Sequence, residues 1–194
     1  MTETAERTVQ RLVEALATGD RATLQDILDP GVPLRALLPR RTVEVTGSAE
    51  AMAEMLGWLA EVPEVVPVQS VVEPVGDLWH AGYRFVLRGL GTQRVVEQHA
   101  YCTVDGGRIT RIRLICSGFR PATTPTVTDL DALGDSCATL TPRIAAGLEA
   151  MAPGQILAVR SDDPSAAEGI AAWSRLTGHQ LIAARGNHFY LRRG

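Results

Sequence analysis

The chain has 194 residues, 45% of them hydrophobic and 21% charged, and its 22 acidic and 19 basic residues leave a formal charge of −3. This is a globular composition, and its mild acidity argues against a nucleic-acid-binding protein, which needs a basic surface. No apolar run approaches the ~20 residues of a membrane span, and the polar, acidic start is not a targeting segment. We therefore expect neither nucleic acid nor membrane as a partner. All basic residues are arginine, which excludes chemistry that depends on a lysine Schiff base.

The three cysteines, Cys102, Cys116 and Cys137, lie far apart and form no C-x-x-C pair. Their odd number and wide spacing disfavour a disulfide framework and a zinc site. The sequence therefore predicts a cytoplasmic protein with free thiols, no metal site and no cofactor.

Residues 1–60 carry three apolar stripes with helical spacing, and each stripe predicts a helix. Asp20 is the expected N-cap of the second helix and Ser48 that of the third. The stripes are Val9, Leu12, Val13 and Leu16; Leu24, Ile27 and Leu28; and Met52, Met55, Leu56 and Leu59.

Strands follow these helices. Residues 78–88 alternate between two faces, residues 94–104 and 109–119 form two further strands, and Asp105-Gly106-Gly107 is a hairpin turn. Three helices before a meander predict an α+β fold in which helices cover one face of a curved sheet.

This order of elements, with the closing hairpin of residues 104–109, resembles the nuclear-transport-factor-two-like superfamily, which includes the SnoaL-like cyclases. The resemblance implies a cone-shaped pocket domain over residues 1–121. That superfamily hosts isomerases, hydrolases, cyclases and non-catalytic binders, so the resemblance gives the fold and not the activity. Its members often dimerise through the open sheet face, so a homodimer is an expected state.

Strand pairing predicts which side chains line the cone. A two-residue loop at Gly106-Gly107 would place Thr103 opposite Thr110 and Glu97 opposite Cys116, and a one-residue slip would reverse the faces. His99 is then a candidate general base oriented by Glu97 or Tyr101, or a packed, hydrogen-bonded histidine. Cys116 is a buried small side chain or a second sulfur-accepting thiol. The predicted pocket is lined by Trp79, Tyr83, Glu97, His99, Tyr101 and Cys116.

Residues 122–128 are rich in threonine and proline and lack an apolar period, so they are predicted to be a linker. The remaining residues, 129–194, read as strand, helix, strand, helix, strand, strand. Strands are expected at 127–133 and 156–159, and the second helix is expected to begin with Asp163 as N-cap and Pro164 as first helical residue.

This second half resembles the TusA/SirA family of small sulfur carriers, and the resemblance implies a two-layer βαβαββ domain. It also implies that Cys137 carries a persulfide. The matching residues are Leu130-Asp131-Ala132-Leu133-Gly134, Cys137, Met151-Ala152-Pro153-Gly154-Gln155, Ser161-Asp162-Asp163-Pro164, Trp173 and Thr177-Gly178-His179.

The sequence departs from that family at the cysteine itself. The family motif is Cys-Pro-x-Pro, whereas this chain has Cys137-Ala138-Thr139-Leu140 and a proline at Pro142. A proline inside a helix clashes with the carbonyl four residues before it. We therefore expect the helix to begin with Thr141 as N-cap. Cys137 would then lie in a loop beside Asp135, with a pKa near the ordinary ~8.5.

Three functions follow as hypotheses. In the first, Cys137 accepts sulfur from a cysteine desulfurase or rhodanese-type donor. It then passes the sulfur to a protein or to a small molecule, such as one held in the N-terminal pocket. In the second, the N-terminal pocket is an isomerase, cyclase or hydratase and the carrier domain is degenerate. In the third, the protein binds a ligand without catalysis.

Overall fold

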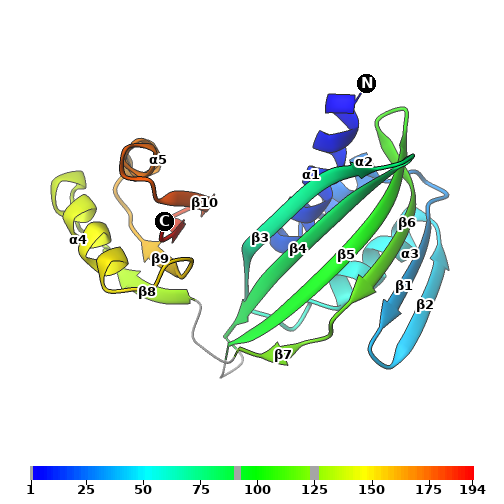
Figure 1. Ribbon diagram of the computed structural model, residues 1–194, viewed down its shortest axis with the longest axis horizontal. Coiled ribbons are helices and arrows are strands. Elements are labelled where there is room, and N and C mark those ends of the chain that lie inside the picture. Colours follow the sequence, from blue (N-terminus) through cyan, green and yellow to red (C-terminus); the bar gives the residue numbers. More distant parts are fainter. Residues whose placement is uncertain (1, 90–92, 123–126) are drawn as a thin grey trace. The chain divides into compact units, whose positions relative to one another are not determined.

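The computed structural model describes residues 2–89, 93–122 and 127–194. The chain divides into two compact units, Met1–Ala122 and Thr123–Gly194 (Figure 1). Residues 123–126 of the predicted linker lie outside the described residues, whereas residues 127 and 128 already belong to a strand of the second unit.

The N-terminal unit is built on one curved sheet, seven-stranded within the described residues. Its main order is β2-β1-β6-β5-β4-β3, and β7 pairs with β5. The β1–β6 pair is parallel and the other pairs are antiparallel. The strands are β1 (Pro33–Leu38), β2 (Arg41–Thr46), β3 (Glu64–Val75), β4 (Leu78–Arg88), β5 (Arg94–Asp105), β6 (Arg108–Cys116) and β7 (Arg120–Pro121).

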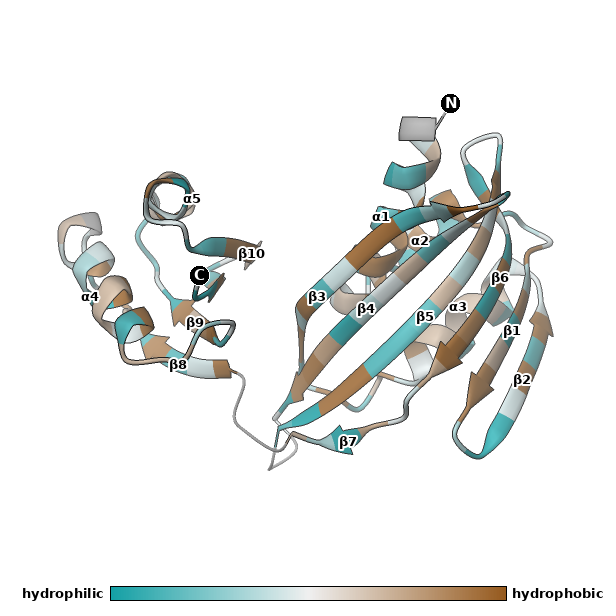
Figure 2. Cartoon of the chain, in the orientation of Figure 1, coloured by the Kyte–Doolittle hydropathy of each residue, from teal (hydrophilic) through white to brown (hydrophobic). Residues whose placement is uncertain are grey.

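Three helices cover one face of this sheet, as Figure 1 shows. They are α1 (Thr2–Thr18), α2 (Arg21–Ile27) and α3 (Ser48–Gly57). Their apolar stripes and alternate residues of the strands form one core, in which Leu12, Leu24 and Phe85 are almost fully buried. Figure 2 shows the resulting alternation of apolar and polar bands along the strands. The predicted α+β class and the three helices are confirmed.

The helix starts follow local chemistry. Asp20 caps α2 as predicted, because its carboxylate accepts the backbone N–H of Thr23 at 3.0 Å. The predicted cap of α3 is wrong by one residue. Gly47 holds that position at φ 112°, which favours glycine, and Ser48 is already helical.

The C-terminal unit has a four-stranded sheet with the order β10-β11-β9-β8. Its elements are β8 (Val127–Asp131), α4 (Cys137–Glu149), β9 (Ile156–Arg160), α5 (Ala166–Thr177), β10 (Gln180–Arg185) and β11 (His188–Arg192). Both helices pack on one face, because the core combines Ile144 and Ile170 with Leu157, Val159 and Leu191. This confirms the predicted two-layer βαβαββ arrangement.

The start of α5 differs from the prediction. Its N-cap is Ser165, two residues after the expected Asp163. Asp163 instead accepts the backbone N–H and the hydroxyl of Ser165 at 2.7 and 2.6 Å, which forms a tight turn before the helix.

Candidate functional site

The pairing of β5 with β6 decides which side chains share a face. The two-residue turn is as predicted, because Asp105 pairs with Arg108 around Gly106 and Gly107. Beyond the turn the register shifts, so that Thr103 pairs with Arg111 and Thr110 is the extra residue of a β-bulge. Every predicted pair beyond it is therefore displaced by one residue.

This shift divides the predicted pocket set between the two faces of the sheet. Cys116 pairs with Gln98, and Gln98 pairs with Tyr83, so these three lie in a row on the helix-covered face. Trp79 shares that face because it pairs with the buried Cys102. Glu97, His99 and Tyr101 lie on the opposite, outer face. Their predicted place in the pocket was wrong because one bulged residue exchanges the faces of a strand.

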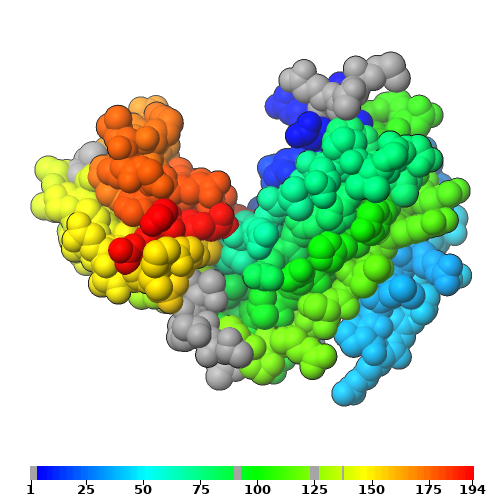
Figure 3. Space-filling model, viewed as in Figure 1, coloured from blue at the N-terminus to red at the C-terminus, as the bar shows by residue number. Residues whose placement is uncertain are grey.

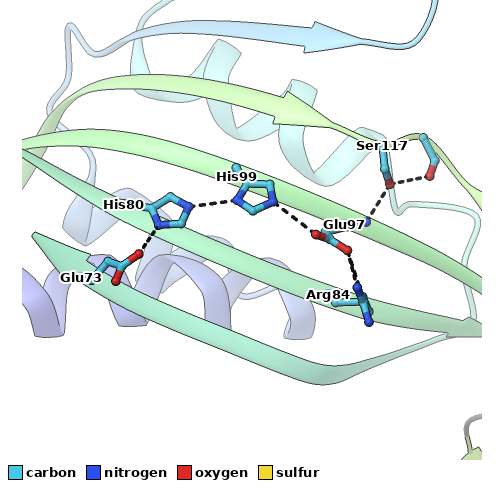
Figure 4. Close-up of polar contacts among 7 residues, drawn as sticks. Glu73, His80, Arg84, Glu97, His99 and Ser117 are labelled. Carbon is cyan, nitrogen blue, oxygen red and sulfur yellow. Dashed lines mark hydrogen bonds and ion pairs between the residues drawn. The ribbon is translucent and has the colours of Figure 1, made fainter. Parts of the chain in front are cut away.

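On the outer face, five side chains form a continuous polar chain across β3, β4 and β5 (Figure 4). Glu73 Oε1 lies 3.0 Å from His80 Nδ1, and His80 Nε2 lies 3.0 Å from His99 Nδ1. His99 Nε2 lies 3.3 Å from Glu97 Oε1. Arg84 completes the chain by donating to Glu97 Oε2 at 2.6 Å and 3.0 Å.

The two imidazoles are joined by one hydrogen bond, between His80 Nε2 and His99 Nδ1. Only one of these two nitrogens can donate, so the tautomer of one ring constrains that of the other. The rings are parallel within 3° with centroids 5.2 Å apart, and Tyr101 stacks on His80 at 5.0 Å. Hydrogen bonds from Arg84, with a smaller contribution from His99, lower the pKa of Glu97.

His80, Glu73 and Arg84 were not among the candidates drawn from the sequence. The alternation of residues 78–88 does place His80 and Arg84 on one face. Only the register across three strands shows that this face meets His99 and Glu97.

The helix-covered face has a different chemistry. Tyr83 is 2% exposed, and its hydroxyl finds no hydrogen-bond partner among the described residues. Burial raises the pKa of Tyr83 and also raises the pKa of Cys102 to about 12. Cys116 is half-buried, and its Sγ accepts the backbone N–H of Gly118 at 3.3 Å. Tyr83 and Cys102 are therefore neutral near pH 7 and supply no charge to this face.

In the C-terminal unit, α4 begins at Cys137, with Ser136 as N-cap. The predicted start at Thr141 and Pro142 is therefore wrong, since Pro142 lies inside the helix. The backbone N–H groups of Thr139 and Leu140 both donate to the Ser136 carbonyl at 2.9 Å, which closes the first turn. The side chain of Cys137 lies outside the described part of the structure.

Packing explains why the helix continues through the proline. Leu140 is 1% exposed and stands in one stripe with Ile144 and Leu148, both fully buried. Burying a leucine is worth about 1.5–3 kcal/mol, which is comparable with the ~3 kcal/mol that a helix-interior proline costs. Leu140 therefore brings the first turn, and Cys137 with it, into the helix.

The loop before Cys137 is tied to the neighbouring strand. Gly134, at φ 79°, donates its backbone N–H to Asp162 at 2.7 Å, and Arg160 contacts Asp131 at 2.6 Å. Asp135, two residues before Cys137, forms an ion pair with Arg143. The cation of this pair offsets the negative charge beside the cysteine.

Comparison with known proteins agrees with the two units. Residues 128–192 match the family model described as "Sulfurtransferase TusA". No curated protein matches the chain. The C-terminal unit is thus TusA-like, as its sequence motifs predicted.

Solved structures similar to the N-terminal part are nuclear-transport-factor-two-like and SnoaL-like proteins. The structure of an IdmH loop-truncation variant is 17% identical, with a TM-score of 0.50, and the match covers 57% of this chain and 91% of that one. An NTF-2 like protein of unknown function from Burkholderia xenovorans LB400 is 15% identical (TM-score 0.47, 63% and 88% covered). A SnoaL-like polyketide cyclase from Jannaschia sp. CCS1 is 18% identical (0.43, 57% and 85%). At these identities the likeness concerns the fold alone.

Two features are absent from the residues that the structure describes. None of the helices there is long and apolar enough to cross a membrane. Within the same residues, histidine, cysteine and acidic side chains form no group of three or more that could hold a metal ion.

Proposed function

We propose that the protein is a sulfur carrier in which Cys137 holds a sulfane sulfur. The observation that carries the proposal is the match of residues 128–192 to the sulfurtransferase family, with Cys137 as the first residue of a 13-residue helix. The N-terminus of a helix presents unpaired N–H groups and positive potential, which stabilise a thiolate or a perthiolate.

The transfer needs no external oxidant. The Cys137 thiolate attacks the terminal sulfur of a persulfide on the donor. A new S–S bond forms at Cys137, and the donor cysteine leaves as a thiolate. In the second step a nucleophile on the acceptor attacks the terminal sulfur of Cys137, which leaves as a thiolate. The same helix N-terminus therefore favours Cys137 as nucleophile and as leaving group.

The donor of this proposal is a cysteine desulfurase or rhodanese-type enzyme, and the acceptor is a small molecule or a protein. The anchored loop of residues 131–135 supports the proposal, because it fixes the backbone at the point where the helix begins. The Asp135–Arg143 ion pair supports it as well, since the cation of Arg143 offsets the negative charge of Asp135.

The test is intact-mass measurement after incubation with a cysteine desulfurase and cysteine. We expect an adduct of about 32 Da, one sulfur atom, on the wild type and its absence in Cys137→Ser. Cys102→Ser and Cys116→Ser are matched controls and should keep the adduct. An adduct that persists in Cys137→Ser would overturn the proposal.

The alternative of an isomerase, cyclase or hydratase in the N-terminal pocket receives less support. Its predicted acid–base pair, Glu97 and His99, lies on the outer face of the sheet, away from Tyr83 and Cys116. For that alternative we would expect turnover that persists in Cys137→Ser and is lost in His99→Gln.

A further inference from the structure

A cavity of about 660 Å³ lies at one end of the N-terminal sheet. Its wall comes from the turn between β1 and β2, the residue after α3, the start of β5 and the segment that follows β6. All of these belong to the N-terminal unit. Figure 3 shows that unit from its outer face.

Four arginines, Arg40, Arg41, Arg94 and Arg120, line this cavity, whereas none of the acidic residues that the structure describes does. In the described parts of the chain, Arg41 is the only one of them that forms an ion pair, at 3.3 Å from Glu54. Glu54 also accepts the indole N–H of Trp58 at 3.2 Å, so one carboxylate holds two groups of the wall.

The other three guanidinium groups have no partner among the described residues. Within residues 2–89, 93–122 and 127–194, the side chains of Arg40, Arg94 and Arg120 have neither an ion pair nor a hydrogen bond. Strand pairing places Arg120 opposite Val95 and Arg94 opposite Pro121, so the two arginines leave adjacent strands on opposite faces, and both border the cavity at the end of the sheet. Cations gathered around one cavity repel one another, and a bound anion offsets that repulsion.

The rest of the wall is apolar and aromatic. Trp58 and Phe119 lie beside the arginines, and Phe119 is 40% exposed. Cys116 is also part of the wall. Cys116 shares a cross-strand row with Gln98 and the buried Tyr83, whose hydroxyl has no partner among the described residues. The cavity thus combines positive charge with aromatic surface.

We propose that this cavity binds a small organic anion, with a carboxylate or phosphate group held by the arginines of its wall. Its apolar body packs against Trp58 and Phe119. Guanidinium groups form bidentate hydrogen bonds with both kinds of anion, and a few polar groups in an apolar cavity are typical of small-molecule sites. This inference does not rest on sulfur transfer at Cys137.

The test uses phenyl phosphate and benzoate as probes for the two anion types, with benzyl alcohol as the uncharged comparison. Binding to the full-length protein is measured by isothermal titration calorimetry. The variant is Arg94→Gln/Arg120→Gln. Its control is Arg7→Gln/Arg21→Gln, which removes the same charge from exposed helix positions outside the cavity.

We expect saturable binding of at least one anionic probe and none of benzyl alcohol. The cavity variant should bind at least tenfold more weakly, and the control should bind like the wild type. A phosphate-only or carboxylate-only result identifies the anion. Absence of binding by both probes, or equal losses in variant and control, would overturn the inference.

A second measurement covers the case in which the double variant does not fold. In Cys137→Ser, Cys116 is the accessible thiol of the described cysteines, because Cys102 is buried. A bound probe should slow the reaction of Cys116 with iodoacetamide at saturating concentration. An unchanged rate would show that the probe binds elsewhere. Because Cys137 is absent from this experiment, its outcome is independent of the sulfur-carrier proposal.

Discussion

Replacing Leu140 by alanine tests where α4 begins. Leu140 is 1% exposed and packs in the same core as Ile144 and Leu148. Truncation of a buried leucine to alanine costs about 2–5 kcal/mol, through lost burial and the cavity left behind. At about 0.05–0.15 kcal/mol per residue, that is a large fraction of the stability of the C-terminal unit.

The assay is urea denaturation of the full-length chain, with hydrogen exchange and mass spectrometry to assign unfolding to peptides from residues 137–151. At an m-value of about 1–3 kcal/mol per molar urea, we expect the midpoint of these peptides to fall by about 1 M or more. Peptides from the N-terminal unit should keep their midpoint, because Leu140 belongs to the core of the C-terminal unit.

Leu176→Ala is the matched control. The chemical change is the same and lies in the same unit, but Leu176 is 85% exposed. Its effect should stay within about 0.5 kcal/mol. If Leu140→Ala costs no more than this control, the first turn of α4 is not packed, and the helix begins later, as the proline had suggested.

Three further predictions concern titratable groups. Cys137 should alkylate with a midpoint below the ordinary ~8.5, because a helix N-terminus favours its thiolate; a midpoint at or above that value contradicts the helix start. Cys102, whose pKa burial raises to about 12, should resist iodoacetamide at pH 8 until the protein unfolds, and modification of the native protein would show that the core opens. Glu97→Gln should lower the free energy of unfolding at pH 7 by at most ~1 kcal/mol, since the pair with Arg84 is exposed. Hydrogen bonds lower the pKa of Glu97, so its contribution exists above its unfolded-state pKa and disappears as the pH falls through the folded one. Urea denaturation at neutral and acidic pH measures the free energy of unfolding that Glu97→Gln loses. An equal loss at both pH values would refute the role of the ionised Glu97 carboxylate.

The strands β1, β2 and β3 were not assigned from the sequence. Residues 64–75 form β3 although they contain Pro67 and Pro74. β3 lies at the edge of the sheet, where a proline needs no partner for its missing N–H. The hairpin of β1 and β2 was also missed. These strands were left without a predicted secondary structure, but the predicted α+β fold class did not depend on them.

The sequence by itself determined the features that depend on nearby residues: the apolar stripes of the helices, the alternation of β4, the turn at Gly106 and Gly107, and the TusA-like motifs around Cys137. Only the tertiary structure decided the features that depend on distant contacts. The bulge at Thr110 moved Glu97 and His99 to the outer face, where they meet His80. The burial of Leu140 drew Cys137 to the first position of α4. Strand register and helix start are both fixed by which side chains the core can bury, and that choice is made between segments far apart in the chain.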